Sequence, residues 1–276
     1  MGFECSTESA SWGTLREEVS LKENQEEKRM ERSVAIVLAA GQGSRMGGSV
    51  KKQFLRIGSY PVLYYSLQCF QNSEDIQEII LVTGEDSITY CQKEIVDLYG
   101  FTKVTRIIPG GKERYDSVYA GLLACKECDY VFIHDGARPF ISEEIIKRGL
   151  DGAKKTGACV VGMPSKDTVK LADEEGYVKE TPARNLVWTV QTPQVFRYSL
   201  IRKAYESMQS KDMTAVTDDA CVVEQETGVK IWLAEGSYKI RLDSRIFKKY
   251  NHELSKKWNG IYDKIVIGLP QNDTEI

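Results

Sequence analysis

The chain has 276 residues, of which 42% are hydrophobic and 28% are charged, a balance typical of a globular protein. Its formal net charge of −3 gives no overall basic surface, so broad nucleic-acid binding is not expected. The sequence has no run of about 20 apolar residues, which argues against membrane association through a spanning helix, and its seven scattered cysteines predict a cytoplasmic protein with free thiols.

The first segment, residues 1–32, is polar and acidic and lacks the apolar core of a signal peptide. It therefore predicts a disordered leader ahead of a domain that begins at Ser33. Met30 is an alternative start of the protein.

Runs of Val and Ile then alternate with helical patterns. Strands are expected in VAIVLAA, EIILVTG, VTRII, YVFIHDG and ACVVGMP, and helices over 63–70, 88–99, 117–125 and from Ser142 onward. Strands this apolar are buried on both faces, as in a parallel sheet covered by helices. The pattern predicts an α/β fold with a doubly wound, mostly parallel, Rossmann-like sheet in a single domain over 33–258.

The stretch from about 165 to 188 alternates short polar and apolar groups around a Glu-Gly turn. It predicts a β-hairpin arm that projects from the sheet and pairs with a second subunit. Helices are expected over 198–208, 218–226 and 245–258 and a strand in KIWLA, and residues 259–276 predict a disordered tail.

A glycine loop follows the first strand in AIVLAAGQGSRMGG. Met46 stands where the dinucleotide fingerprint requires its third glycine, and no Gly-Lys-Ser/Thr completes a P-loop. The segment from Ser33 to Ser73 has no acidic residue, and cations follow the loop at Arg45, Lys51, Lys52 and Arg56. Backbone amides and cations in this order predict a triphosphate site.

Two further loops follow predicted strands. HDGARPF places Asp135 and Arg138 at the carboxyl end of YVFI, where open α/β sheets bind ligands. PGGKERYDSVYAGL supplies glycines for close approach to a nucleoside, and Ser117 is expected to open the next helix.

The motifs LAAGQGSRMG, KKQF, GGKERYDSV, HDGARPF, DTVK and QTPQVF, in this order, resemble the 2-C-methyl-D-erythritol 4-phosphate cytidylyltransferase family from about Ser33 to Glu235. The resemblance implies transfer of CMP from CTP to 2-C-methyl-D-erythritol 4-phosphate in non-mevalonate isoprenoid biosynthesis. It also implies a homodimer joined through the β-arm. A phosphate monoester is mostly dianionic at neutral pH, so the reaction needs charge stabilisation and no general base.

By the same resemblance, each site residue has an expected role. The catalytic cations are Arg45, Lys52 and Arg241; the CTP-binding residues are Ala39, Ala40, Gly41, Gly43, Gly111 and Ser117; and the acceptor-binding residues are Asp135, Arg138, Thr168, Arg184, Thr192 and Thr217. The expected metal is Mg²⁺, with Asp135 as the candidate protein ligand and the CTP phosphates alone as the alternative.

Two positions depart from the family pattern. Lys112 replaces an acid after the paired glycines, and EGSYKIRLDSRIF replaces the segment that carries the third cation, where Arg241 fits better than Lys239. Two alternatives therefore stay open: a cytidylyltransferase for ribitol 5-phosphate or a similar polyol phosphate, and a non-catalytic CTP-binding homologue.

Overall fold

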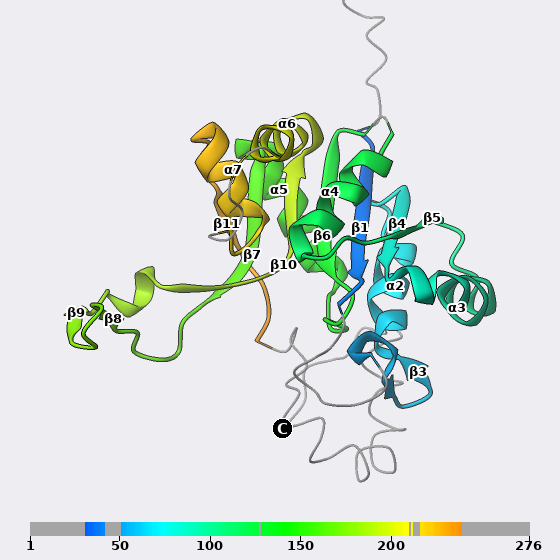
Figure 1. The fold of residues 1–276 in the computed structure, drawn as a ribbon, viewed down its shortest axis with the longest axis horizontal. Coiled ribbons are helices and arrows are strands. Elements are labelled where there is room, and N and C mark those ends of the chain that lie inside the picture. Colours follow the sequence, from blue (N-terminus) through cyan, green and yellow to red (C-terminus); the bar gives the residue numbers. More distant parts are fainter. Residues whose placement is uncertain (1–30, 42–50, 127, 210, 212–215, 239–276) are drawn as a thin grey trace, which may run out of the picture. The chain divides into compact units, whose positions relative to one another are not determined.

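The computed structural model describes residues 31–41, 51–126, 128–209, 211 and 216–238. Its main sheet has seven strands: β1 (Ser33–Ala39), β4 (Glu78–Thr83), β5 (Val104–Pro109), β6 (Tyr130–Asp135), β7 (Ala158–Pro164), β10 (Trp188–Arg197) and β11 (Trp232–Glu235). They are ordered β11-β7-β10-β6-β1-β4-β5 (Figure 1). All run in one direction except β10, which pairs antiparallel with both β6 and β7. The predicted mostly parallel α/β sheet is confirmed.

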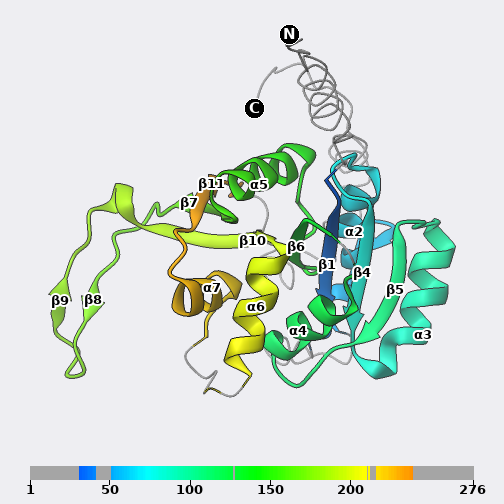
Figure 2. The ribbon, with the colours of Figure 1, turned by 90° about the horizontal axis from the view of Figure 1, so that it is seen from above.

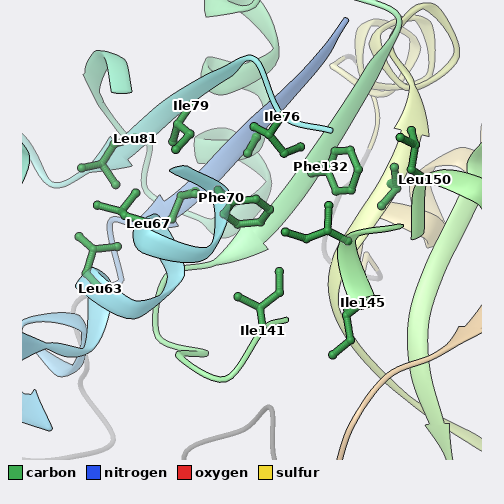
Figure 3. Close-up of a cluster of buried hydrophobic side chains, with 14 of the residues drawn as sticks. Leu63, Leu67, Phe70, Ile76, Ile79, Leu81, Phe132, Ile141, Ile145 and Leu150 are labelled. Carbon is green, nitrogen blue, oxygen red and sulfur yellow. The ribbon is translucent and has the colours of Figure 1, made fainter. Parts of the chain in front are cut away.

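Helices cover both faces of this sheet (Figure 2). They are α2 (Val62–Asn72), α3 (Ile88–Cys91) with its π-helical continuation η4 (Gln92–Asp97), α4 (Arg114–Ala124), α5 (Glu143–Thr156), α6 (Tyr198–Met208) and α7 (Asp219–Thr227). Alternate residues of β1 point to opposite faces, so Val37 packs in the cluster with α2 and α5, and Ile36 in the cluster with α4, α6 and α7. Figure 3 shows the first cluster, where Phe70 of α2 lies next to Phe132 of β6, with 6.4 Å between the ring centroids.

Short elements lie outside the main sheet. They are η2 (Lys52–Phe54), the paired β2 (Arg56–Ile57) and β3 (Tyr60–Pro61), η3 (Glu85–Ser87), β8 (Leu171–Ala172), β9 (Val178–Glu180) and η5 (Arg184–Leu186). Strands β8 and β9 pair antiparallel, and Gly176 turns between them with φ +92°. The predicted hairpin arm is therefore present, and Figures 1 and 2 both show it extending from β7 and β10 away from the sheet.

The structure corrects two expectations from the sequence. No strand was expected in QTPQVF, but β10 occupies it, because Pro193 and the polar residues around it hide a strand that is buried between two others. Ser117 does not open α4. The helix begins at Arg114, three residues before Ser117, and its N-cap Glu113 forms a capping box with Asp116.

Some expectations fall on residues that the structure does not describe. The leader over 1–30, the helix over 245–258 and the tail over 259–276 lie outside the described residues. In the described part of the chain, every helix is too short or too polar to span a bilayer.

Candidate active site

The predicted site residues follow strands that end at the same edge of the sheet. β1 ends at Ala39, β5 at Pro109 and β6 at Asp135; the three strands are parallel, β1 pairs with β6, and only β4 separates β1 from β5. β10 runs the other way, so its first half, which includes Thr192, reaches this edge as well. The strand order thus gathers segments that are far apart in the sequence.

On the side of the predicted nucleotide site, Gly110 brings predicted CTP-binding residues of two loops close together. Gly110 lies between Ala40 and Ser117, since a Cβ built on it would be 2.6 Å from the Ala40 Cβ and from the Ser117 Oγ. The Gly111 amide donates a hydrogen bond to Ser117 Oγ at 3.1 Å. Only glycine fits at this close approach, so the end of β1 and the first turns of α4 form one wall.

Gln53 is a residue of this wall that the sequence analysis did not single out. Its side chain is buried, and its Nε2 donates to the carbonyl oxygens of Ala39 at 2.5 Å and Gly41 at 3.2 Å. Gln53 therefore fixes the backbone where the glycine loop begins. It follows Lys52 in η2, so the same turn carries a predicted catalytic cation and a loop anchor.

On the acceptor side, Asp135 and Arg138 form a direct ion pair. Asp135 Oδ2 accepts from Arg138 Nε at 3.0 Å, and Asp135 Oδ1 accepts from Arg114 Nε at 3.3 Å. Burial alone would raise the pKa of Asp135, but the two guanidinium groups outweigh it and hold the pKa below its usual value. Asp135 stays ionised and, at 30% side-chain exposure, still faces outward.

Arg114 also pairs with a second carboxylate. Its Nη1 and Nη2 donate to the two oxygens of Asp219, each at 2.9 Å, and Asp219 is fully buried. The Tyr205 hydroxyl donates to the same carboxylate at 2.7 Å. Burial by itself would lower the pKa of Arg114, but Asp219 and Asp135 raise it above its usual value, so Arg114 is always charged.

Thr192 lies behind Asp135, and it is buried. Its Oγ1 accepts from the Asp135 amide at 3.2 Å and lies 3.1 Å from His134 Nδ1. His134 Nε2 lies 3.2 Å from the Arg138 carbonyl oxygen. The hydroxyl of Thr192 thus holds the HDGAR segment in place, and its direct contact with the acceptor stays a prediction.

The remaining predicted residues lie farther out. Thr168 and Arg184 are exposed on the arm, where Arg184 Nη2 donates to Thr168 Oγ1 at 3.1 Å. Thr217 is exposed just before α7, and Lys112 is exposed before α4. Gly43, Arg45, Arg241 and Lys239 lie outside the described residues.

A metal ion held by the protein would need several oxygen, nitrogen or sulfur donors that converge on one point. The described residues contain no group of three or more His, Cys, Asp or Glu side chains that could share an ion. Each oxygen of Asp135 already accepts a hydrogen bond from a guanidinium, and two positive neighbours oppose a cation there. The described residues do not fit a protein-held Mg²⁺ site, and the role of Asp135 as a ligand stays a prediction.

The sequence pattern gave no signal for Arg114, Asp219, Tyr205 or Gln53 as site residues. Arg114 stands in the motif GGKERYDSV, but Asp219 lies 105 positions farther along the chain and in none of the quoted motifs. Only the packing of α4, α6 and α7 on one face of the sheet brings them together.

Comparison with known proteins shows which family this chain resembles. The sequence model of IspD, 2-C-methyl-D-erythritol 4-phosphate cytidylyltransferase, matches residues 33–242. A protein of that name from Lachnoclostridium phytofermentans is 48% identical over 209 residues, which are 76% of this chain and 89% of the relative. Another from Clostridium botulinum is 47% identical over 210 residues, 76% of this chain and 90% of the relative.

Solved structures agree with this match. The crystal structure of 4-diphosphocytidyl-2C-methyl-D-erythritol synthase from Anaerococcus prevotii superposes with a TM-score of 0.71 at 30% identity, covering 83% of this chain and 96% of that chain. The Francisella tularensis 2-C-methyl-D-erythritol 4-phosphate cytidylyltransferase superposes with a TM-score of 0.66 at 26% identity, covering 81% and 100%.

Proposed function

The chain belongs to the 2-C-methyl-D-erythritol 4-phosphate cytidylyltransferase family, and from this premise we propose that the edge of the sheet between Ala39 and Asp135 is its active site. The protein is a nucleotidyltransferase of isoprenoid biosynthesis. It transfers CMP from CTP to 2-C-methyl-D-erythritol 4-phosphate and releases pyrophosphate. The observation that carries the site is the meeting of the glycine wall and the Asp135–Arg138 pair at one edge.

We propose that CTP lies on the wall formed by Ala39, Ala40, Gly41, Gly111 and Ser117. The support is the close approach of Gly110 to Ala40 and Ser117, which brings the two loops together into one surface rich in glycine and alanine. Such backbone approaches a base, sugar or phosphate closely. Magnesium would enter with the triphosphate, whose oxygens suit this ion, and would lower its negative charge.

The chemistry is proposed to be charge stabilisation without a general base. The acceptor phosphate is already dianionic, so its oxygen attacks the α-phosphorus of CTP and pyrophosphate leaves. His134 does not serve as a base: both its nitrogens face protein partners, and burial lowers its pKa to about 4. We propose Lys52, with Arg45 and Arg241, as the cations that stabilise charge on the transferred phosphoryl group.

The acceptor is proposed to bind Asp135 and Arg138. Of the three guanidinium nitrogens of Arg138, only Nε has a hydrogen-bonding partner within the described residues, so the two terminal nitrogens can donate to an anion or a hydroxyl. The outward face of Asp135 accepts from polyol hydroxyls. Thr192 and Thr217 are proposed to line the same pocket.

We further propose a homodimer in which Thr168 and Arg184 of one arm complete the acceptor site of the partner. The arm supports this: Leu171, Tyr177, Val178 and Leu186 are all exposed on it. Residence in the cytoplasm is proposed from the six described cysteines, all of which are free.

The test is release of pyrophosphate from CTP and Mg²⁺ with 2-C-methyl-D-erythritol 4-phosphate, with UTP, ATP and ribitol 5-phosphate as controls. We expect release with CTP and methylerythritol phosphate alone. Lys52→Ala should lower kcat about 100-fold, while Lys147→Ala on the exposed side of α5 should not. Faster pyrophosphate release with ribitol 5-phosphate than with methylerythritol phosphate would overturn the assignment of the acceptor. CTP binding without pyrophosphate release would overturn the assignment of the activity.

A further inference from the structure

Asp135 has two guanidinium partners, and only Arg138 belongs to its own loop. The other, Arg114, comes from the first turn of α4. Arg114 uses its Nε for Asp135 and its two terminal nitrogens for Asp219. Both carboxylates therefore lie around one planar guanidinium, and its orientation is fixed by three hydrogen bonds.

Asp219 is a firm anchor because it is buried with hydrogen-bond donors on both of its carboxylate oxygens. It is completely buried, and a buried carboxylate is stable only when it is paired and hydrogen-bonded. Arg114 supplies the charge and Tyr205 supplies a further donor, at 2.7 Å. Asp219 is also the first residue of α7, where the helix dipole favours a negative charge.

The start of α7 is in turn tied to the sheet. Asp218 caps the helix by accepting from the Cys221 amide at 2.8 Å, and it accepts from Gln194 Nε2 at 2.9 Å. Gln194 Oε1 accepts from the Ala220 amide at 3.0 Å. Gln194 lies in β10 between β6 and β7, so the anchor of Arg114 is built into the central sheet.

Arg114 divides its donors unequally between the two carboxylates, and this determines how Asp135 is held. A guanidinium often pairs with both oxygens of one carboxylate. Here Asp219 takes that two-point contact, so Asp135 receives one bond from Arg114 and one from Arg138. The carboxylate of Asp135 stays charged and fixed, with its exposed side open.

From this geometry we infer that Arg114 and Asp219 are positioning residues for the acceptor: they hold Asp135 in an orientation that receives polyol hydroxyls. This inference rests on the proposed function of Asp135 as an acceptor-binding residue. Arg114 acts through Asp135, and Asp219 and Tyr205 act through Arg114.

The test compares KM for methylerythritol phosphate with KM for CTP. Loss of Arg114 alone would leave the Asp219 carboxylate buried without its ion-pair partner. The variant R114Q/D219N therefore removes the positive and the negative charge together. We expect acceptor KM to rise about tenfold and CTP KM to change less than about twofold. R114K should not restore the acceptor KM, because an ammonium cannot make the three-point contact. Unchanged acceptor KM in the folded double variant, or restoration by R114K, would overturn the inference.

A milder variant covers the case in which the double variant does not fold. Tyr205→Phe removes only the hydroxyl that bonds Asp219, and Tyr119→Phe is its matched control, since Tyr119 stacks on Tyr205 at 6.3 Å between ring centroids. We expect a rise of about threefold in acceptor KM for Y205F alone. Equal acceptor KM in Y205F and Y119F would count against the inference.

The proposed function is tested separately in the same assay. If Asp135→Asn leaves acceptor KM unchanged, the acceptor site itself is wrongly placed. If Asp135→Asn raises it while the variants of Arg114, Asp219 and Tyr205 do not, the acceptor site stands and only the positioning role fails.

Discussion

The Thr192 hydroxyl on β10 lies 3.1 Å from Nδ1 of His134 on β6, and both side chains are buried. His134 Nε2 lies 3.2 Å from the Arg138 carbonyl, which can only accept, so Nε2 carries the proton and donates. Nδ1 then accepts from Thr192, whose oxygen accepts from the Asp135 amide. The neutral His134 thus links β6, the loop that carries Arg138, and β10. This link lies behind the proposed acceptor site.

This arrangement predicts a pH dependence of stability. Burial lowers the pKa of His134 to about 4, from 6.5 when it is exposed. Between these values the unfolded chain binds a proton that the folded chain does not, so the free energy of unfolding falls as pH falls. We expect His134 to account for a loss of about 2 kcal/mol between pH 7 and pH 5.

Denaturant titrations at pH 7, 6 and 5 measure this effect. His134→Gln keeps one donor and one acceptor but does not titrate. Between pH 7 and pH 5 its free energy of unfolding should therefore fall by about 2 kcal/mol less than that of the wild type. His252→Gln is the control, because the chain has only these two histidines. Equal losses in all three proteins would refute the assignment.

A second prediction concerns the anchor of the glycine loop. Gln53→Leu removes the donors to the carbonyls of Ala39 and Gly41, and we expect CTP KM to rise about tenfold while acceptor KM stays constant. Steady-state kinetics with each substrate varied checks this. Gln68→Leu, on the exposed side of α2, is the control. Reduced stability with unchanged CTP KM would show that Gln53 serves folding alone.

A third prediction separates Mg²⁺ bound by CTP from Mg²⁺ bound by Asp135. Because Arg114 and Arg138 each take an oxygen of Asp135, Asp135→Asn should leave the half-saturating concentration of free Mg²⁺ unchanged. Its acceptor KM should rise at least about tenfold. Activity measured against free Mg²⁺ at saturating CTP gives the answer. A tenfold shift of the Mg²⁺ curve would instead make Asp135 a metal ligand.

A fourth prediction tests the arm. Leu186 is 75% exposed on it, and Leu186→Asp should produce a folded monomer without activity, as judged by light scattering and pyrophosphate release. Leu98→Asp, at a 61% exposed position beyond η4, is the control and should remain dimeric.

The arm also predicts complementation between two inactive variants. When Lys52→Ala and Arg184→Ala proteins exchange subunits, half the dimers are mixed and each mixed dimer has one intact site. Activity should return to about a quarter of the wild-type value. No recovery would mean that each chain completes its own site.

The sequence by itself determined the fold class, the family and the edge of the sheet at which the predicted site residues gather. Strands that are buried on both faces are apolar along most of their length. The Val and Ile runs of β1, β4 and β6 could therefore be recognised as strands in the sequence. Loops after such strands lie at one edge, which placed Ala40, Gly111 and Asp135 near one another. Strand β10 was missed because Pro193 and its polar neighbours mask the pattern of a buried strand.

Only the tertiary structure decided which partners hold these residues. Gln53 binds two backbone carbonyls, and no side-chain pattern records which carbonyls lack donors. Arg114 meets Asp135 and Asp219 because α4, α6 and α7 pack on one face of the sheet. Local periodicity fixes which face of an element is buried, but the pairing of buried charges depends on contacts between elements far apart in the chain.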